Sequence, residues 1–166
     1  MKRGQQSFGM SIEMIFTIFL IIVFLGFAVW GILVVLKQGN EAKVNLFAQD
    51  LKSDVDKAWV SELSESTFKY NSMPTEVAYV CFVDLNEIAK GQNADFYDEF
   101  RNPNSNLYIY PTNAIGNEKS FNIAHVDLNN SLKYENPLCI KNNKGRVYIH
   151  LRKDFTTSQL VEVSRE

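Results

Sequence analysis

The sequence is poor in the residues that build catalytic and metal sites. It has two histidines and two cysteines in 166 residues, and none of them has the close spacing, such as C-x-x-C, that is typical of zinc sites. The P-loop, the G-x-S-x-G nucleophile motif and the G-x-G-x-x-G dinucleotide motif are all absent. We therefore expect no catalytic residues, no cofactor and no metal, and an enzyme is the least favoured class.

A concentration of basic charge is also lacking. After the hydrophobic span described below, residues 38–166 carry 14 basic and 18 acidic side chains, so their net charge is −4. Proteins that bind nucleic acid have a basic patch or stripe, which argues against DNA or RNA as a partner. One acidic run lacks the D-x-D-x-D-G spacing of a calcium loop, and we interpret it as a solvated face. It consists of Asp84, Glu87, Asp95, Asp98 and Glu99.

What the sequence does have is one long hydrophobic run, residues 14–36. Only Thr17, Gly26 and Gly31 interrupt its 23 residues, and a helix of that length is about 34 Å long, enough to cross ~30 Å of hydrocarbon. A buried core helix would have a polar face, whereas this run is apolar all round. A cleaved signal would be shorter and would end in a small-x-small site, which is missing before Lys37. The run is therefore predicted to be a transmembrane helix that stays in the protein.

Beyond the run, residues 37–63 show the pattern of an amphipathic helix. Apolar residues recur at steps of three and four, which places them on one face. We predict one helix from Ile12 to Leu63, with a joint near Gly39, and expect this face to pack on the following sheet; a coiled-coil seam is the alternative. The face consists of Val44, Phe47, Ala48, Leu51, Val55, Ala58 and Trp59.

Residues 64–166 have the pattern of a β-rich domain. Six strands and one short helix are expected from alternating or continuous apolar runs bounded by turn residues. The predicted fold class is therefore α+β: a long N-terminal transmembrane and amphipathic helix, then a small, mainly antiparallel β-sheet domain. The expected elements are a central strand over 76–83, a short helix over 94–100, strands over 107–110 and 121–128, a hairpin of 138–141 with 146–152, and an edge strand over 159–163.

The side of the membrane on which this domain lies is not decided by charge, because the basic residues on the two flanks of the span are nearly balanced. Three features favour the outside. The N-terminus is short and basic, Cys81 and Cys139 could form a disulfide in an oxidising compartment, and Asn129-Asn130-Ser131 is a glycosylation sequon. Two buried free thiols and a chance sequon are the alternative interpretations.

The first residues, Lys2-Arg3-Gly4-Gln5-Gln6-Ser7 followed by the apolar helix, resemble the class III signal of archaeal type IV pilin-like proteins. In that family a peptidase cuts between a Gly and a Gln on the cytoplasmic side, and the helix stays on the mature subunit and forms the filament core. The resemblance implies that Gly4 and Gln5 are the processing site. Gly9 stands where the family has a glutamate, and Glu13 lies four residues later.

Glu13 is the one ionisable residue against the start of the span, where it either lies at headgroup level or pairs with a neighbouring helix or amine. The partners implied are the lipid bilayer and identical or related subunits, which pack through the N-terminal helix. The leading hypothesis is a single-pass, pilin-like structural protein with an extracytoplasmic domain. The alternatives are a permanently anchored ectodomain that binds a partner or cell-surface component, and an accessory subunit of a membrane complex.

Overall fold

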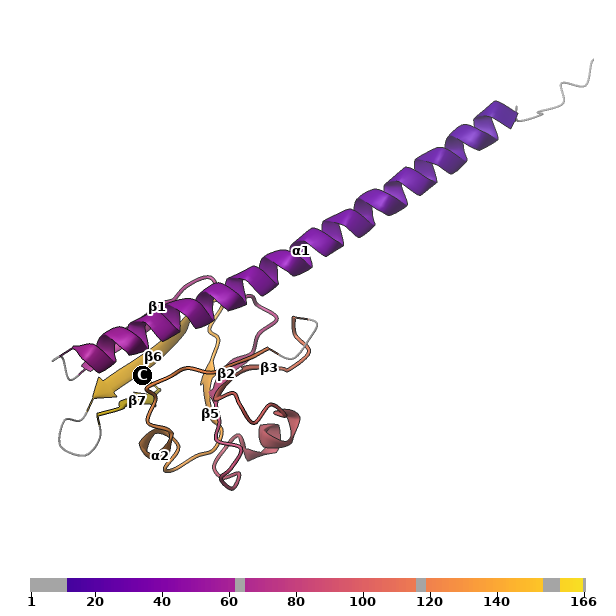
Figure 1. Cartoon of the computed structure of the whole chain (residues 1–166). Coiled ribbons are helices and arrows are strands. Elements are labelled where there is room, and N and C mark those ends of the chain that lie inside the picture. The colour runs from indigo at the N-terminus through magenta and orange to yellow at the C-terminus, as the bar shows by residue number, and fades with distance from the viewer. Residues whose placement is uncertain (1–11, 62–64, 116–118, 154–158, 166) are drawn as a thin grey trace, which may run out of the picture. The chain divides into compact units, whose positions relative to one another are not determined.

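The computed structural model describes residues 12–61, 65–115, 119–153 and 159–165. The chain divides into two compact units, Met1–Gln38 and Gly39–Glu166. The described part of the first unit is helical, and it belongs to α1, a helix that extends over Ile12–Val60 (Figure 1). The α+β fold class is confirmed. α1 continues through Gly39, so the glycine does not end the helix, and it ends three residues before the predicted Leu63.

Within the second unit, α1 buries the face that the sequence predicts. Val44, Phe47, Leu51 and Val55 are fully buried, and the rest of the face is buried or packs against the core. The ring of Phe47 meets the ring of Phe68 edge to face at a centroid distance of 5.6 Å. The prediction that this face packs on the sheet is therefore confirmed, since Phe68 belongs to the first strand of the domain.

The strands form two antiparallel sheets. β1 (Glu65–Tyr70), β6 (Val147–Lys153) and β7 (Val161–Ser164) form one in the order β1-β6-β7. β2 (Tyr79–Phe82), β3 (Leu107–Tyr110), β4 (Ser120–Phe121) and β5 (Leu138–Lys141) form the other in the order β4-β3-β2-β5. Apolar side chains of both sheets and of α1 share one core. Two short helices, η1 (Ala94–Glu99) and α2 (Leu128–Ser131), lie in the connections.

The four-stranded sheet is buried on both faces. On β2, Val80 and Phe82 belong to the core shared with α1, whereas Cys81 belongs to a second cluster with Phe100 and Tyr108. The central strand that the sequence predicts over 76–83 is therefore present, and it is shorter, as β2. The aromatic residues of η1 cover the second cluster, which explains why β2 reads as continuously apolar.

The predicted hairpin of 138–141 with 146–152 is wrong. Both strands exist, but β5 pairs with β2 in one sheet and β6 pairs with β1 and β7 in the other. The side-chain amide of Asn142 donates to the carbonyls of Pro74 and Val77, at 2.9 and 2.8 Å. The turn is thus tied to the segment before β2, and it carries the chain from one sheet to the other.

The predicted strand over 121–128 is also mostly wrong, because only Phe121 of that range lies in β4. The amide of Asn106 takes the place of a strand partner: it donates to the carbonyl of Ile123 and accepts from its N–H, both at 2.8 Å. His125 then has a positive φ of 63°, a conformation that ends extended structure. The predicted edge strand over 159–163 is present as β7, and the predicted helix over 94–100 is the 3-10 helix η1.

Candidate functional site

The apolar half of α1 is the largest exposed apolar surface in the described part of the chain. Its helix is long and apolar enough to cross a membrane, and nearly all its large side chains between Met14 and Leu36 are exposed. Gly26 lies in a notch of about 420 Å³ that is also lined by Val23, Phe27 and Trp30. Exposed apolar side chains of this kind can contact lipid or other helices.

The N-terminal residues that the pilin resemblance involves are beyond what the structure describes. Gly4 and Gln5 lie outside the described residues. Glu13 lies in the first turn of α1, and its side chain is not among those described. The processing site and the role of Glu13 therefore stay predictions.

Cys81 and Cys139 form a disulfide. The two residues face each other on neighbouring strands, since Cys81 of β2 is the direct partner of Cys139 on β5. Both are buried in the second cluster, beneath Phe100 and Tyr108. Of the two alternatives left open by the sequence, the structure therefore has the bridge and not two free thiols. It links the central strand of its sheet to an edge strand.

Asn129, the acceptor of the sequon, is exposed on α2. The cap of this short helix is Asp127, whose carboxylate accepts from the backbone N–H of Asn130 at 3.1 Å. The hydroxyl of Ser131 accepts from the N–H of Val163 at 2.8 Å. The asparagine is thus accessible to a glycan, whereas Ser131 joins α2 to β7 and Asn130 bonds to the cap residue.

The first histidine, His125, stacks on the last turns of α1. Its ring lies 3.7 Å from that of Trp59, with 6° between the planes, and its Nε2 is 3.9 Å from Oδ1 of Asp56. The carbonyl of His125 accepts from the N–H of Val161, which also joins this loop to β7. This contact is not predictable from the sequence, because 65 residues lie between Trp59 and His125.

The second histidine, His150, lies on the outer side of the three-stranded sheet. Its Nε2 contacts a carboxylate oxygen of Glu65, and its Nδ1 is 3.4 Å from the hydroxyl of Thr67. Both partners come from β1, a strand that the sequence did not predict. A hydroxyl, an imidazole and a carboxylate therefore meet here. Two of the three residues, Glu65 and Thr67, also line a pocket.

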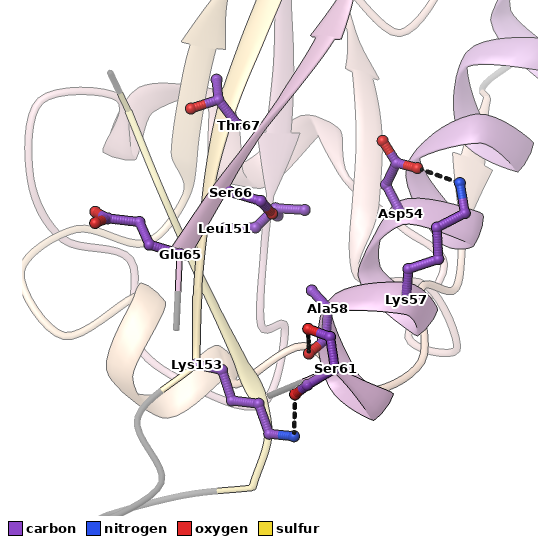
Figure 2. A pocket seen from close by; sticks show the side chains of 9 residues that line it. All are labelled: Asp54, Lys57, Ala58, Ser61, Glu65, Ser66, Thr67, Leu151 and Lys153. Atoms are coloured by element: carbon purple, nitrogen blue, oxygen red, sulfur yellow. Dashed lines mark hydrogen bonds and ion pairs between the residues drawn. The ribbon is translucent and has the colours of Figure 1, made fainter. Parts of the chain in front are cut away.

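A small pocket of about 220 Å³ lies between α1, β1 and β6 (Figure 2). Lys57 forms an ion pair with Asp54 at 2.8 Å on its α1 side. The ammonium of Lys153 donates to the carbonyls of Trp59 and Ser61 at the end of the helix. These charges are paired with one another or with the helix end, where a cation is favourable. The other residues that line the pocket are Ala58, Glu65, Ser66, Thr67 and Leu151.

The acidic run does not converge on a metal site: no group of three metal-ligating side chains occurs in the residues that the structure describes. Four of its members lie near two tyrosines that pack against the second cluster, Tyr97 and Tyr110: Asp84, Glu87, Asp98 and Glu99. The hydroxyl of Tyr97 donates to the carbonyl of Glu87 at 2.8 Å, and burial raises the pKa of Tyr97. Burial, with the charge of Glu99, likewise raises the pKa of Tyr110. These tyrosines stay neutral and act as packing residues.

Comparisons with known protein families, with curated proteins and with solved structures found no match to this chain.

Proposed function

We propose that the chain is a single-pass, pilin-like structural protein with an extracytoplasmic domain. The observation that carries this proposal is the contrast between the two halves of α1. The half up to Leu36 is exposed and apolar on all sides, whereas the half from Val44 buries one face in the domain. A helix built in this way can lie in lipid and then pack among identical helices, while the folded domain stays outside the bilayer.

The disulfide supports the extracytoplasmic side. Structural disulfides persist in oxidising compartments and are rare in the reducing cytosol. The bridge between Cys81 and Cys139 is buried, so it has a structural place and no access for redox partners. The exposed Asn129 is compatible with the same side. The domain would meet the extracellular medium, and Gly4 would meet the cytoplasmic peptidase.

The processing claim is tested by N-terminal sequencing and intact mass of the protein from its native membranes. A mature chain that starts at Gln5 supports prepilin-type processing, and Gly4→Asp should then leave the first four residues in place. If the natural protein and the Gly4→Asp variant both start at Met1, prepilin-type processing is refuted. A permanently anchored ectodomain is then the better-supported function.

The sidedness claim is tested separately by blocking free thiols in intact cells with a membrane-permeant maleimide. If the domain is extracytoplasmic, Cys81 and Cys139 are in a disulfide and escape the maleimide. The denatured chain should then accept a thiol-reactive mass tag on both cysteines only after the disulfide has been reduced. A chain whose thiols are already blocked before reduction would place the domain in the cytosol. The chain has no other cysteine, so the tag reports this pair alone.

A further inference from the structure

A polar pocket of about 350 Å³ lies at one end of the four-stranded sheet. β2 ends there at Phe82, β3 begins there at Leu107 and β4 ends there at Phe121, because Leu107 pairs with both of the other two residues. The loops at these strand ends line the pocket together with the first residue of α2. Its volume lies within the range of about 300–1,000 Å³ that is usual for small-molecule sites.

Hydrogen bonds hold the walls of the pocket in place. The N–H of Val83 donates to the carbonyl of Asn106 at 3.0 Å, and the side chain of Asn106 is bound to Ile123 as described above. The fully buried amide of Asn136 fixes the backbone of Asp84. It accepts from the N–H of Asp84 at 3.2 Å and donates to its carbonyl at 2.8 Å. The pocket is therefore a feature of the folded domain and does not need a ligand to form it.

Several polar groups in the lining have hydrogen-bonding capacity that the fold does not use. Oδ1 of Asp84 accepts from the backbone N–H and the side-chain amide of Asn86, at 2.9 and 3.1 Å, whereas Oδ2 has no hydrogen bond to any residue that the structure describes. The side-chain amides of Asn104 and Asn122 are exposed and likewise make no hydrogen bond within the described part of the chain. A carboxylate oxygen and two carboxamides are thus free to bind a ligand.

We propose that this pocket binds a neutral hexopyranose unit of a saccharide. A carboxylate only accepts hydrogen bonds and a carboxamide both donates and accepts them, so together they match neighbouring sugar hydroxyls, which do both. The lining also includes apolar residues that suit the C–H groups of a sugar ring, namely Leu85, Pro103 and Leu128.

Other classes of small ligand fit this lining less well. No basic side chain is among the described residues that line the pocket, and the charge of Asp84 repels an anion. An ammonium group only donates hydrogen bonds, so it would leave the donors of Asn104 and Asn122 unmatched. Ca²⁺ takes about 6–8 oxygen ligands, usually with several carboxylates, whereas one carboxylate lines this pocket. An apolar ligand would bury the carboxamides without partners.

The pocket belongs to the second compact unit. Sugar binding there requires neither cleavage after Gly4 nor assembly through α1, so it can fail or succeed independently of the pilin-like function proposed above.

Binding is tested by saturation-transfer difference NMR of the full chain, in a detergent without a sugar headgroup and with EDTA present. The probes are the methyl α-glycosides of glucose, galactose and mannose. Every protein carries Asn129→Gln, so that no glycan attached next to Leu128 fills the pocket. At least one probe should show saturable transfer with a Kd of about 1–10 mM, as expected for a ligand of this size with few polar contacts.

Two sets of variants locate the binding site. Asp84→Asn should weaken binding about tenfold, because it replaces a charge-assisted acceptor by a neutral amide. Asn104→Ala with Asn122→Ala should weaken binding at least as much. Because neither of these two side chains makes a hydrogen bond within the described part of the chain, the double variant is decisive even if Asp84→Asn disturbs the turn at Asn86.

Asn113→Ala is the matched control, because Asn113 is another exposed asparagine and does not line the pocket. It should bind the sugar as tightly as the parent chain. The assignment would be overturned if none of the three glycosides shows saturable transfer, or if the double variant binds as tightly as Asn113→Ala. A sugar that needs bound Ca²⁺ gives no signal in EDTA and therefore also counts against it.

Discussion

Removal of the Cys81–Cys139 disulfide should destabilise the domain strongly. The bridge closes a loop with a sequence separation of 58 residues, and the chain-entropy relation for a loop of that length gives about 4 kcal/mol of stabilisation at 25 °C. A domain of this size typically unfolds in urea with a slope of about 2 kcal/mol per molar. The variant Cys81→Ala with Cys139→Ala should therefore lower the urea midpoint by roughly 2 M.

The assay is urea unfolding of the full chain in detergent, followed by near-ultraviolet circular dichroism, which reports aromatic residues such as those around the bridge. A reductant added to the denaturant should lower the midpoint of the natural chain and leave the variant unchanged. A variant whose free energy of unfolding stays within about 1 kcal/mol of that of the oxidised natural chain would refute the reasoning. It would mean that the loop is already held together in the unfolded state.

Three further predictions concern packing and buried polar contacts. Phe47→Ala should lower the free energy of unfolding by about 3–5 kcal/mol, because the ring is fully buried. Leu46→Ala, on the exposed side of α1, should change it by less than about 0.5 kcal/mol. Equal effects of the two variants in urea unfolding would contradict the burial of Phe47. Burial raises the pKa of Tyr70, whose hydroxyl donates to the carbonyl of Lys43 at 2.7 Å. Its contribution should therefore be full below about pH 10 and be lost as the pH rises through the higher folded-state pKa, and Tyr70→Phe should flatten this alkaline loss in pH-dependent melting. Asn136→Ala should cost about 1–3 kcal/mol in the same urea assay, because the fully buried amide satisfies several backbone groups.

The parts of the fold that the sequence could predict are those with strong periodicity. The face of α1 around Phe47 and Leu51 follows a helical repeat, and its burial follows from that repeat alone. β3 was predicted with its observed bounds, 107–110, because Pro111 ends a short run of aromatic and branched residues. In both cases a local pattern and the tertiary packing demand the same structure.

β1 was missed because its local pattern is ambiguous. Residues 65–70 read Glu-Ser-Thr-Phe-Lys-Tyr, and only Phe68 and Tyr70 alternate as a half-buried strand requires. Ser66 and Thr67 add no apolar periodicity of either a helix or a strand. Pairing with β6 decides the structure, and that pairing joins residues about 80 positions apart, which periodicity does not report.

The hairpin failed for a related reason. A turn with Gly145 between two apolar runs favours a hairpin, and the tight turn does exist, as the contacts between Asn143 and Arg146 show. Lys144 and Gly145 take the positive φ values. Whether β5 and β6 pair with each other depends on which other strands compete for them. Here β5 pairs with β2, and β6 pairs with β1. The turn was local and predictable; the partner choice was not.

The candidate functional residues divide in the same way. The apolar half of α1 can be recognised from its composition alone, so it is predictable from the sequence. The contacts of His125 with Trp59 and of His150 with Glu65 join residues 66 and 85 positions apart, and each depends on β7 or β1 being in place. A sequence with two isolated histidines gives no sign that one contacts α1 and the other β1. That convergence exists only after folding, because the strands that carry these residues must first pair with distant parts of the chain.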